Sequence, residues 1–406
     1  MARPACELAG IFRQHGASYR ATHRLSRQQG RVMRAIEVCR TAALGAHVEE
    51  CSQCRHTRIS YNSCRGALWA RHCPKCQNRE RAQWLESRKA ELLPGEYFQV
   101  VFTLPEEIAR MAFCNPEVVY GLLFRAASET LLTLARDPKH LGAEIGFFAI
   151  LHTWGRGALW ALLYHPHLHC VVPGGGLSPD HQRWVSCLPG FFLPVRVLSR
   201  LFRRLFLSAL EKAFRDGKLR FLGELELLRE AAAFARYLAP LAQREWVVYA
   251  KPPFGGPQQA LEYLGRYTHR VALSNERLLA VRNDQVTFQW KDYRRKDQHK
   301  SRVMTLPAEE FIRRFLLHTL PAGFQRIRHF GLLANRHRQQ RLALCRQRLT
   351  NPAAELLPPP AACRQLSQAL ASRPPLRCPQ CGAGVMIRPG FLPAYRWPAA
   401  PPPDSS

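Results

Sequence analysis

Two kinds of hydrophobic spacing alternate along the middle of the chain, and together they predict an α+β fold. Short runs of aromatic and β-branched residues that end in proline or glycine predict strands: "YFQVVFTLP", "IGFFAILHTW", "HLHCVVPGGG" and "EWVVYAKPPFGG". Two longer runs, "NPEVVYGLLFRAASETLLTLAR" and "PVRVLSRLFRRLFLSALEKAFRDGKL", have the spacing of amphipathic helices. "NERLLAVRNDQVTFQWKDY" predicts a hairpin that turns at Asn283 and Asp284. Because strands and helices do not repeat in βαβ order, we expect a mainly antiparallel sheet with flanking helices.

The length and the distribution of residue types predict three units. With 406 residues the chain is too long for one ordinary core. Cysteines gather before the first predicted strand, and the proline-rich stretch "AAELLPPPAACRQ" follows the last predicted elements. We therefore predict a small module over residues 1–92, a larger α+β domain over 93–340, and a linker and tail over 341–406.

The excess of basic residues indicates what kind of partner the protein binds. The chain has 59 Lys and Arg against 30 Asp and Glu, a formal net charge of +29. Such an excess indicates a polyanionic partner. We expect no membrane span, because no stretch of about 18 apolar residues lacks charges. The start of the sequence has no long apolar segment either, so we expect no signal peptide. We therefore expect the protein to be cytoplasmic.

Cysteine spacing near the amino terminus predicts a structural zinc site. "CSQC" and "CPKC" are separated by eighteen residues, a spacing typical of zinc ribbons. Two such knuckles complete a tetrahedron of thiolates and leave no open position for chemistry. The expected ligands are Cys51, Cys54, Cys73 and Cys76. Four neighbours could replace a ligand or build a second site: His47, His56, Cys64 and His72.

A single knuckle near the carboxyl terminus leaves its role open. "RCPQCGAGVMIRPG" contains Cys378 and Cys381, which make half of a zinc site. Cys345, Cys363 or a partner protein could complete it. A metal-free tail with incidental cysteines fits the sequence equally well.

Alternating histidines in "LLYHPHLHCVVPGGG" are candidate metal ligands. Residues two apart on a strand point to the same face, so His167 and His169 lie side by side while Leu168 turns into the opposite core. Two imidazoles suit a divalent metal that keeps open positions for a substrate oxygen. Half-exposed strand histidines without a metal are an equally good interpretation from spacing alone. His165 has the same parity, but Pro166 disturbs the strand there, so we rank it lower.

A tyrosine pair follows in "GGPQQALEYLGRYTHRVALSN". Gly256 and Pro257 favour a helix start, which places Tyr263 and Tyr267 one turn apart on one helix face. Such a pair can simply pack on a core. Near a metal, however, a tyrosine hydroxyl can attack a phosphodiester.

These motifs together resemble a known family. The His167–Leu168–His169 triplet followed by Tyr263 and Tyr267 resembles the HUH endonucleases with two tyrosines. The longer motifs are similar to the insertion sequence 91 family of rolling-circle transposases, over about residues 30 to 340. They include "RHCPKCQ", "VVFTLPEE", "HPHLHCVVPGGGLS", "FLPVRVLSRLFRRLF", "YLGRYTHRVALSN" and "EEFIRRFLLHTLPAGFQRIRHFGLLANR".

The resemblance implies a fold, a reaction and a partner. It makes residues 1–92 a zinc-binding DNA-recognition module and residues 93–340 a ferredoxin-like HUH catalytic domain. His167 and His169 would hold Mg or Mn, and Tyr263 or Tyr267 would attack DNA to leave a 5′-phosphotyrosine and a free 3′-OH. The substrate would be single-stranded DNA at transposon ends and the target site, in a bacterial, nucleoid-associated setting. Candidates for further roles are His152 or Glu262 as a third metal ligand, and Arg266 and Arg270 as DNA contacts.

One departure from the family pattern leaves alternatives open. "RGALWA" occurs at Arg65–Ala70 and again at Arg156–Ala161, each copy just before a motif that should bind metal. If the second copy shifts the register of the histidine strand, cleavage could fail. The chain would then be a non-catalytic, zinc-containing DNA-binding protein. A rolling-circle replication initiator or relaxase would share the chemistry but not the substrate.

Overall fold

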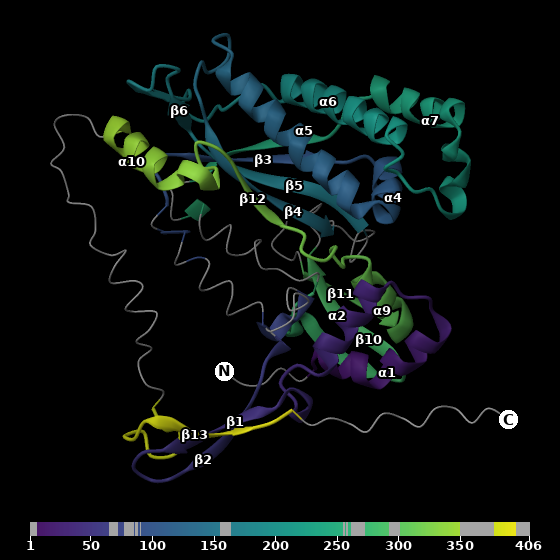
Figure 1. Cartoon of the computed structure of the whole chain (residues 1–406), viewed down its shortest axis with the longest axis vertical. Helices are drawn as coiled ribbons and strands as arrows, with labels where there is room; N and C mark the ends of the chain where they lie inside the picture. Colours follow the sequence, from purple (N-terminus) through teal and green to yellow (C-terminus); the bar gives the residue numbers. More distant parts are fainter. Residues whose placement is uncertain are drawn as a thin grey trace.

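The structure is a computed structural model with three visible parts (Figure 1). A sheet covered by long helices forms the largest part, a smaller unit of helices and strands lies beside it, and a three-stranded ribbon extends from that unit. The structure describes residues 6–64, 72–76, 85, 88–89, 91–154, 164–254, 256, 259–260, 273–291, 301–349 and 377–394.

The central sheet has five strands in the order β12-β4-β5-β3-β8, and every neighbouring pair is antiparallel. Four of these strands agree with the sequence prediction. The fifth, β12, was not predicted and adds to the edge of β4. The strands are β3 (Tyr97–Thr103), β4 (Gly146–Trp154), β5 (Tyr164–Pro173), β8 (Val248–Phe254) and β12 (Ile327–Gly331).

The connections give the sheet a ferredoxin-like topology. Helices lie between β3 and β4, β5 follows β4 directly, and a second set of helices lies between β5 and β8, which is the β-α-β-β-α-β pattern. The prediction of an α+β fold with a mainly antiparallel sheet is therefore confirmed. The intervening elements are α4 (Glu106–Cys114), α5 (Pro116–Arg136), β6 (Gly175–Leu177), β7 (Trp184–Ser186), α6 (Val195–Arg215), η5 (Gly223–Arg229) and α7 (Ala231–Gln243).

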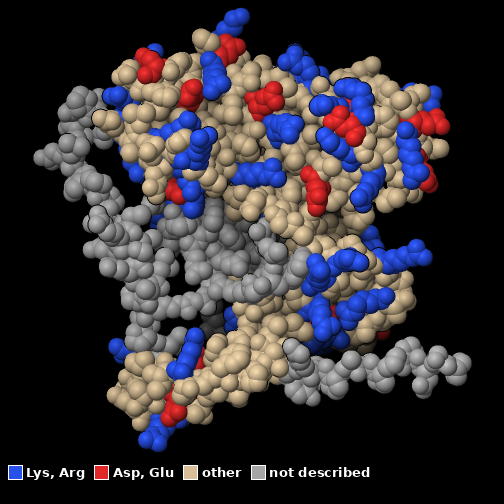
Figure 2. All heavy atoms as spheres, viewed as in Figure 1, with Lys and Arg blue, Asp and Glu red and all other residues tan. Residues whose placement is uncertain are grey.

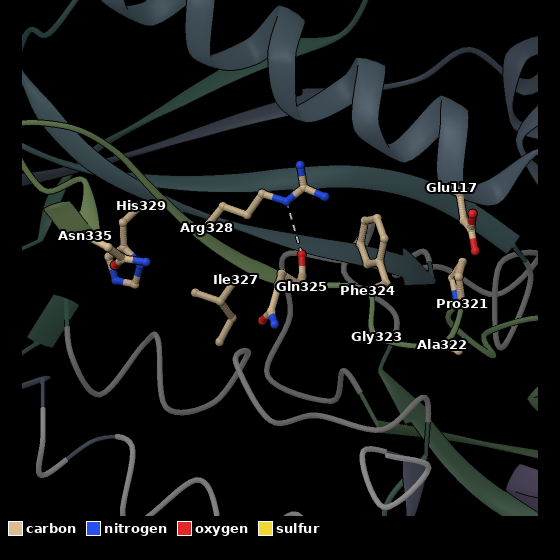
Figure 3. A pocket seen from close by; sticks show the side chains of 10 residues that line it. All are labelled: Glu117, Pro321, Ala322, Gly323, Phe324, Gln325, Ile327, Arg328, His329 and Asn335. Carbon is tan, nitrogen blue, oxygen red and sulfur yellow. Dashed lines mark hydrogen bonds between the residues drawn. The ribbon is translucent and has the colours of Figure 1, made fainter. Parts of the chain in front are cut away.

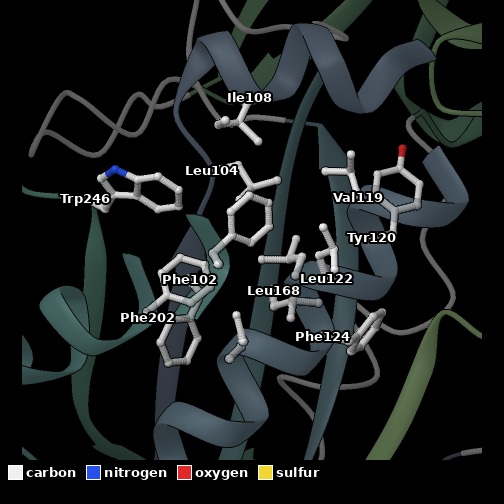
Figure 4. Packing of buried hydrophobic residues seen from close by; sticks show 14 of the residues in the cluster. Phe102, Leu104, Ile108, Val119, Tyr120, Leu122, Phe124, Leu168, Phe202 and Trp246 are labelled. Carbon is white, nitrogen blue, oxygen red and sulfur yellow. The ribbon is translucent and has the colours of Figure 1, made fainter. Parts of the chain in front are cut away.

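One face of the sheet packs against these helices and forms the main core (Figure 4). Phe102 from β3 meets Phe202 from α6 with ring centroids 4.9 Å apart, and Trp246 lies 5.6 Å from the same Phe202 ring. Leu168 is fully buried in this core. Residues that alternate with these core residues along each strand therefore point to the opposite face of the sheet, which these helices do not cover.

The long apolar helix α5 belongs to this core. By length and composition it is the one helix among the described residues that could cross a membrane. However, two-thirds of its apolar window is buried inside the protein, including Val119, Leu123 and Leu131. Packing against the sheet accounts for its composition, so this helix is weak evidence for a membrane.

The smaller unit joins two segments that are far apart in sequence. Phe12 and Val32 from its helices pack with Phe288 and Phe311 in one hydrophobic cluster. Asn283 and Asp284 have φ values of 48° and 58°, which confirms the predicted tight hairpin turn. The elements are α1 (Leu8–Thr22), α2 (Arg27–Glu37), η6 (Asn275–Arg277), β9 (Leu278–Arg282), β10 (Gln285–Lys291), β11 (Ser301–Pro307) and α9 (Ala308–Leu316).

The ribbon combines both ends of the described chain. Its strand order is β13-β1-β2, so a carboxyl-terminal strand pairs with an amino-terminal hairpin. The boundaries 1–92, 93–340 and 341–406 remain a prediction, and packing crosses them here and in the smaller unit. The remaining elements are η1 (Ala42–Leu44), β1 (Ala46–Cys51), β2 (Thr57–Tyr61), η7 (Asn335–His337), α10 (Arg338–Leu349) and β13 (Met386–Leu392).

Candidate active site and metal centres

The open face of the central sheet contains the predicted histidine pair. His167 and His169 point to the same side of β5, and Leu168 between them points into the core on the helix side, as the alternation predicted. Both histidines are nevertheless buried, with exposed fractions of 7% and 4%. They are therefore not the half-exposed strand histidines of the alternative interpretation.

A third histidine comes from the neighbouring strand. His152 on β4 lies directly opposite His167 on β5, and the side chain of His152 is 1% exposed. One ring nitrogen from each of His152, His167 and His169 lies within 4.8 Å of the others. Of the two candidates for a third ligand, His152 is thus beside the pair, whereas Glu262 lies outside the described residues. His165 is not part of this group, and burial lowers its pKa.

Hydrogen bonds orient the two strand histidines. His167 Nδ1 lies 2.8 Å from the carbonyl oxygen of His165, so Nδ1 donates its proton there and the Nε2 lone pair points away. The Gln99 side chain on β3 contacts His169 Nδ1 through its amide nitrogen, and turning that amide over puts its oxygen there as an acceptor for the Nδ1 proton. The two Nε2 atoms then face each other at 3.0 Å. Two nitrogens about 2.1 Å from one metal and at right angles are about 3.0 Å apart, so this separation fits a shared ion.

The donor set indicates which metal the three histidines suit. Imidazole nitrogens favour borderline ions, while magnesium prefers oxygen ligands. Of Mg and Mn, the two expected ions, the three nitrogens therefore fit manganese better. His167 and His169 fit a divalent metal because the second nitrogen of each ring is in a polar contact, the arrangement common to metal-binding histidines.

Aromatic and basic groups line one side of this group. The Trp154 ring stacks on His152, with centroids 5.1 Å apart and planes 9° apart. The Arg326 guanidinium lies 4.9 Å above the Trp154 ring. His318, after α9, hydrogen-bonds Thr153 at 3.2 Å and so ties the smaller unit to this end of β4. A planar ring beside a cation is a common surface for stacking nucleic-acid bases.

A pocket opens along the edge strand β12 (Figure 3). Its volume is about 560 Å³, and Phe324, Ile327, Arg328 and His329 contribute to its wall. The Arg328 guanidinium lies 4.3 Å above the Phe124 ring, so this cation is held in place by an aromatic ring. Burial, with the nearby charges of arginines, lowers the pKa of His329 to about 4, which keeps its imidazole neutral near pH 7. The pocket therefore offers one cation held on a ring, the carboxyl group of Glu117 and neutral polar groups.

The predicted tyrosines and their arginines lie outside the described residues: Tyr263, Arg266, Tyr267 and Arg270. The chain leading to them is described. Gln259 and Ala260 are helical, and Ala260 is fully buried in a cluster with Ile150 and Val171. Ile150 lies opposite His169 in the sheet, so the segment that precedes the tyrosines packs on the histidine face.

Four cysteines form a buried cluster in the smaller unit. Cys76 Sγ lies 3.6 Å from Cys39 Sγ and 3.5 Å from Cys64 Sγ, and Cys73 completes the group. All four are buried. Hydrogen bonds from the neighbouring thiols lower the pKa of Cys39, which favours the thiolate that binds zinc. Four sulfurs at these separations suit a tetrahedral structural zinc.

The expected set Cys51, Cys54, Cys73 and Cys76 does not form one site. The structure puts the "CPKC" knuckle with Cys39 and Cys64, while Cys51 and Cys54 lie beside the knuckle near the carboxyl terminus. The predicted grouping was wrong because spacing identifies a knuckle but not the knuckle that faces it. Cys64 is one of the neighbouring candidates, but Cys39, two residues after α2, has no spacing signal.

The histidines near these cysteines have other roles. His72 Nε2 accepts a hydrogen bond of 3.1 Å from the backbone N–H of Leu320, whose side chain belongs to the main core. His47 packs against Phe391 of β13. Neither histidine belongs to the cysteine clusters. His72 thus connects the four-cysteine cluster to the domain that contains the histidine group.

Basic side chains spread over the surface, in keeping with the sequence charge (Figure 2). Many acidic groups are already neutralised by neighbouring arginines. Glu310, for example, accepts hydrogen bonds from Arg313 and Arg314, which hold the pKa of its carboxyl at about 2. The positive charge in excess of these pairs remains available for a polyanion.

Comparison with known proteins agrees with these observations. Residues 146–341 match a family model described as "Putative transposase", and residues 11–104 match one described as "Transposase zinc-binding domain". A protein of Sinorhizobium fredii named "Putative transposase y4qJ" is 61% identical over 390 residues, which cover 95% of this chain and 96% of that protein. No solved structure matches the chain.

A more distant relative narrows the assignment. The "Transposase for insertion sequence element IS801" of Pseudomonas savastanoi is 27% identical over 368 residues, covering 86% of this chain and 80% of that protein. The zinc-binding match supports structural zinc in the amino-terminal part. Together with the ferredoxin-like sheet and its histidine group, these similarities establish that the chain belongs to the insertion sequence 91 family of transposases, and its partner is DNA.

Proposed function

We propose that this transposase cuts and rejoins single-stranded DNA at transposon ends through a 5′-phosphotyrosine intermediate, in rolling-circle transposition. The hydroxyl oxygen of Tyr263 or Tyr267 attacks the phosphorus, and the bond from phosphorus to the 3′ oxygen breaks. That oxygen takes up a proton and becomes a free 3′-OH. A 3′-OH later attacks the phosphotyrosine, which restores a DNA phosphodiester and frees the tyrosine. No nucleotide cofactor is needed because the covalent link conserves the bond.

The observation that carries this proposal is the buried group of three histidines on the open face of the sheet. His152, His167 and His169 would hold a divalent ion, with manganese favoured over magnesium by their nitrogen donors. The ion would neutralise charge on the scissile phosphate. Support for a nearby nucleophile comes from Ala260, which packs on this face just before the tyrosines.

The histidine register favours an active enzyme over a non-catalytic DNA-binding protein. The second "RGALWA" copy falls between Trp154 and Tyr164 and lies outside the described residues, as does the first. The strands on either side still pair, with Trp154 opposite Tyr164 and His152 opposite His167, and the irregularity in register between these two pairs lies outside the stretch that contains His152, His167 and His169. This pairing keeps the three histidines together and argues against the shift that would have spoiled the site.

Charge and aromatic rings support single-stranded DNA as the substrate. The formal charge of +29 favours phosphate binding, and the Trp154 ring near Arg326 offers a stacking surface beside the histidines. We also assign Arg266 and Arg270 as DNA contacts, since they flank the second tyrosine. A replication initiator or relaxase would use the same chemistry, but membership in a transposase family selects transposition. The expected setting is the nucleoid in the bacterial cytoplasm.

A covalent-adduct assay tests this function. Labelled single-stranded oligonucleotides from both element ends are incubated with protein and manganese, then separated under denaturing conditions. Wild-type protein should give a covalent protein–DNA band, and the Tyr263→Phe/Tyr267→Phe double variant should give none. Tyr249→Phe is the matched control, because Tyr249 is a half-exposed tyrosine on β8 and should leave the band unchanged. An adduct that survives in the double variant would show that another residue is the nucleophile.

Replacing Gln99 by Leu should weaken metal binding. The Gln99 amide holds His169 Nδ1, and a rotation of that amide lets its oxygen accept the Nδ1 proton while Nε2 faces the metal. Loss of such a partner typically costs about 10–100-fold in metal affinity. The manganese concentration that gives half-maximal cleavage should rise by this factor. Gln99→Glu, which retains an acceptor, should restore most of the lost manganese affinity. An unchanged manganese requirement in Gln99→Leu would contradict the positioning role of Gln99.

A further inference from the structure

The carboxyl-terminal knuckle meets the amino-terminal ribbon at four sulfurs. Cys51 Sγ lies 3.7 Å from Cys381 Sγ, and Cys54 Sγ lies 3.6 Å from Cys378 Sγ. All four sulfurs lie within 4.8 Å of one another. A disulfide needs about 2.05 Å between sulfurs, so these are four separate thiols arranged around one point. The separations suit the edges of a tetrahedron of zinc thiolates.

The two knuckles share one backbone design. In "CSQCR" the N–H of Gln53 donates to Cys51 Sγ at 3.4 Å, and in "CPQCG" the N–H of Gln380 donates to Cys378 Sγ at 3.3 Å. The residue after each second cysteine has a positive φ, 54° at Arg55 and 68° at Gly382. Backbone N–H groups that point at sulfur stabilise the thiolate form, which is the form that binds metal.

The segments around the two knuckles are fitted to each other. Ser52 N–H donates to the Val385 carbonyl at 2.9 Å, and Val385 N–H donates back to Ser52 Oγ at 3.1 Å. A side chain at Gly384 would overlap Cys51 Sγ, so only glycine allows the chain to pass so close. The contact is therefore a built junction between residues more than 300 positions apart in the sequence.

The junction has too little apolar packing to hold by itself. Its buried cluster consists of Cys51, Cys378 and Met386. Other apolar side chains of the ribbon, such as Ile59 and Ile387, are about half exposed. Units with so small a core usually depend on a metal or a disulfide. Free thiols in a tetrahedral arrangement leave the metal as the stabilising element.

We propose that Cys51, Cys54, Cys378 and Cys381 bind a second structural zinc ion that fastens residues 377–394 to the amino-terminal module. The matched zinc-binding region ends at residue 104, so two of these ligands lie outside it. The site is independent of the cluster of Cys39, Cys64, Cys73 and Cys76. It closes the chain into a loop and makes the carboxyl-terminal strand β13 part of the ribbon.

Zinc counting on the full-length protein tests the site. All counts are made with His167→Ala/His169→Ala also present, so that the histidine group adds no zinc; with every cysteine intact, the protein measured by elemental analysis should contain two zinc ions per chain. Cys378→Ser/Cys381→Ser and Cys51→Ser/Cys54→Ser should each contain one, and the quadruple variant should also contain one because both pairs serve the same ion. Cys114→Ser/Cys187→Ser, which changes cysteines outside both clusters, should retain two. A count of two in the Cys378→Ser/Cys381→Ser variant, or of one with every cysteine intact, would overturn the proposal.

A cleavage experiment tests the fastening directly. A site for a specific protease is inserted between Pro358 and Pro359 of the full chain, and the cut protein is passed over a sizing column. The carboxyl-terminal piece should stay with the larger piece and separate only after a chelator removes zinc. The same piece with Cys378→Ser/Cys381→Ser should separate at once. A piece that separates while zinc is bound, or remains attached after zinc is gone, would refute the metal link.

Discussion

Replacing His167 and His169 together by alanine lowers the rate of DNA cleavage by about a thousandfold or more. The two imidazoles supply two of the three nitrogens that surround the proposed metal position. A metal typically contributes several kcal/mol to such a reaction, and about 4 kcal/mol corresponds to a thousandfold in rate. Single-turnover cleavage of a labelled oligonucleotide at saturating manganese measures the loss.

The neighbouring histidine provides a matched control for this experiment. His165 lies on the same face of β5 but outside the three-histidine group: its backbone carbonyl accepts from His167 Nδ1, and its ring lies 5.6 Å from the His167 ring. His165→Ala keeps that carbonyl, so its cleavage rate should stay near that of the wild type. DNA binding should also persist in the double alanine variant, because basic side chains elsewhere supply it. A folded double variant that cleaves DNA at the normal rate would show that cleavage does not depend on a metal held by these histidines.

Replacing Cys64 by Ser should unfold the smaller unit. Cys64 belongs to the buried four-cysteine cluster, which packs in the same hydrophobic cluster as Phe12 and Phe311. Apparent binding free energies of structural zinc are about 10–16 kcal/mol in small domains, more than most single substitutions cost. We expect the variant to lose one zinc ion and to show an early thermal transition that the wild type lacks. Circular dichroism recorded during heating measures this transition.

The control for this prediction comes from the same unit. Cys6 is half-buried and donates only a long contact to the Leu279 carbonyl. Cys6→Ser should keep the wild-type zinc count and melting curve. Cys378→Ser/Cys381→Ser should lose one zinc ion without this early transition, since that cluster lies in the ribbon. An unchanged melting curve for Cys64→Ser would show that the buried cluster does not stabilise the unit.

Most of the central fold was predictable because its signals are local. The apolar runs at β3, β4 and β8 and the helical spacing of α5 and α6 depend only on residues close in sequence. The edge strand β12 was missed. Its five residues are half-buried, and their extended conformation depends on pairing with β4, which no local pattern announces.

The histidine group was likewise predictable only in part from the sequence. Strand alternation was enough to place His167 and His169 on one face. His152 remained one of two candidates until the register between β4 and β5 set it opposite His167. Gln99 carried no signal at all, because its contact with His169 exists only through the pairing of β3 with β5.

The cysteines show most clearly what the sequence could and could not predict. Spacing by itself identified "CSQC", "CPKC" and "CPQC" as candidate knuckles, since two cysteines three positions apart converge through one local turn, and it left a metal-free tail open for the last of them. Only the tertiary structure decided their partners, giving Cys39 and Cys64 to one knuckle and joining the other two across the chain. A tetrahedral site needs two pairs, and the second pair is chosen by long-range strand pairing and packing, which spacing does not encode.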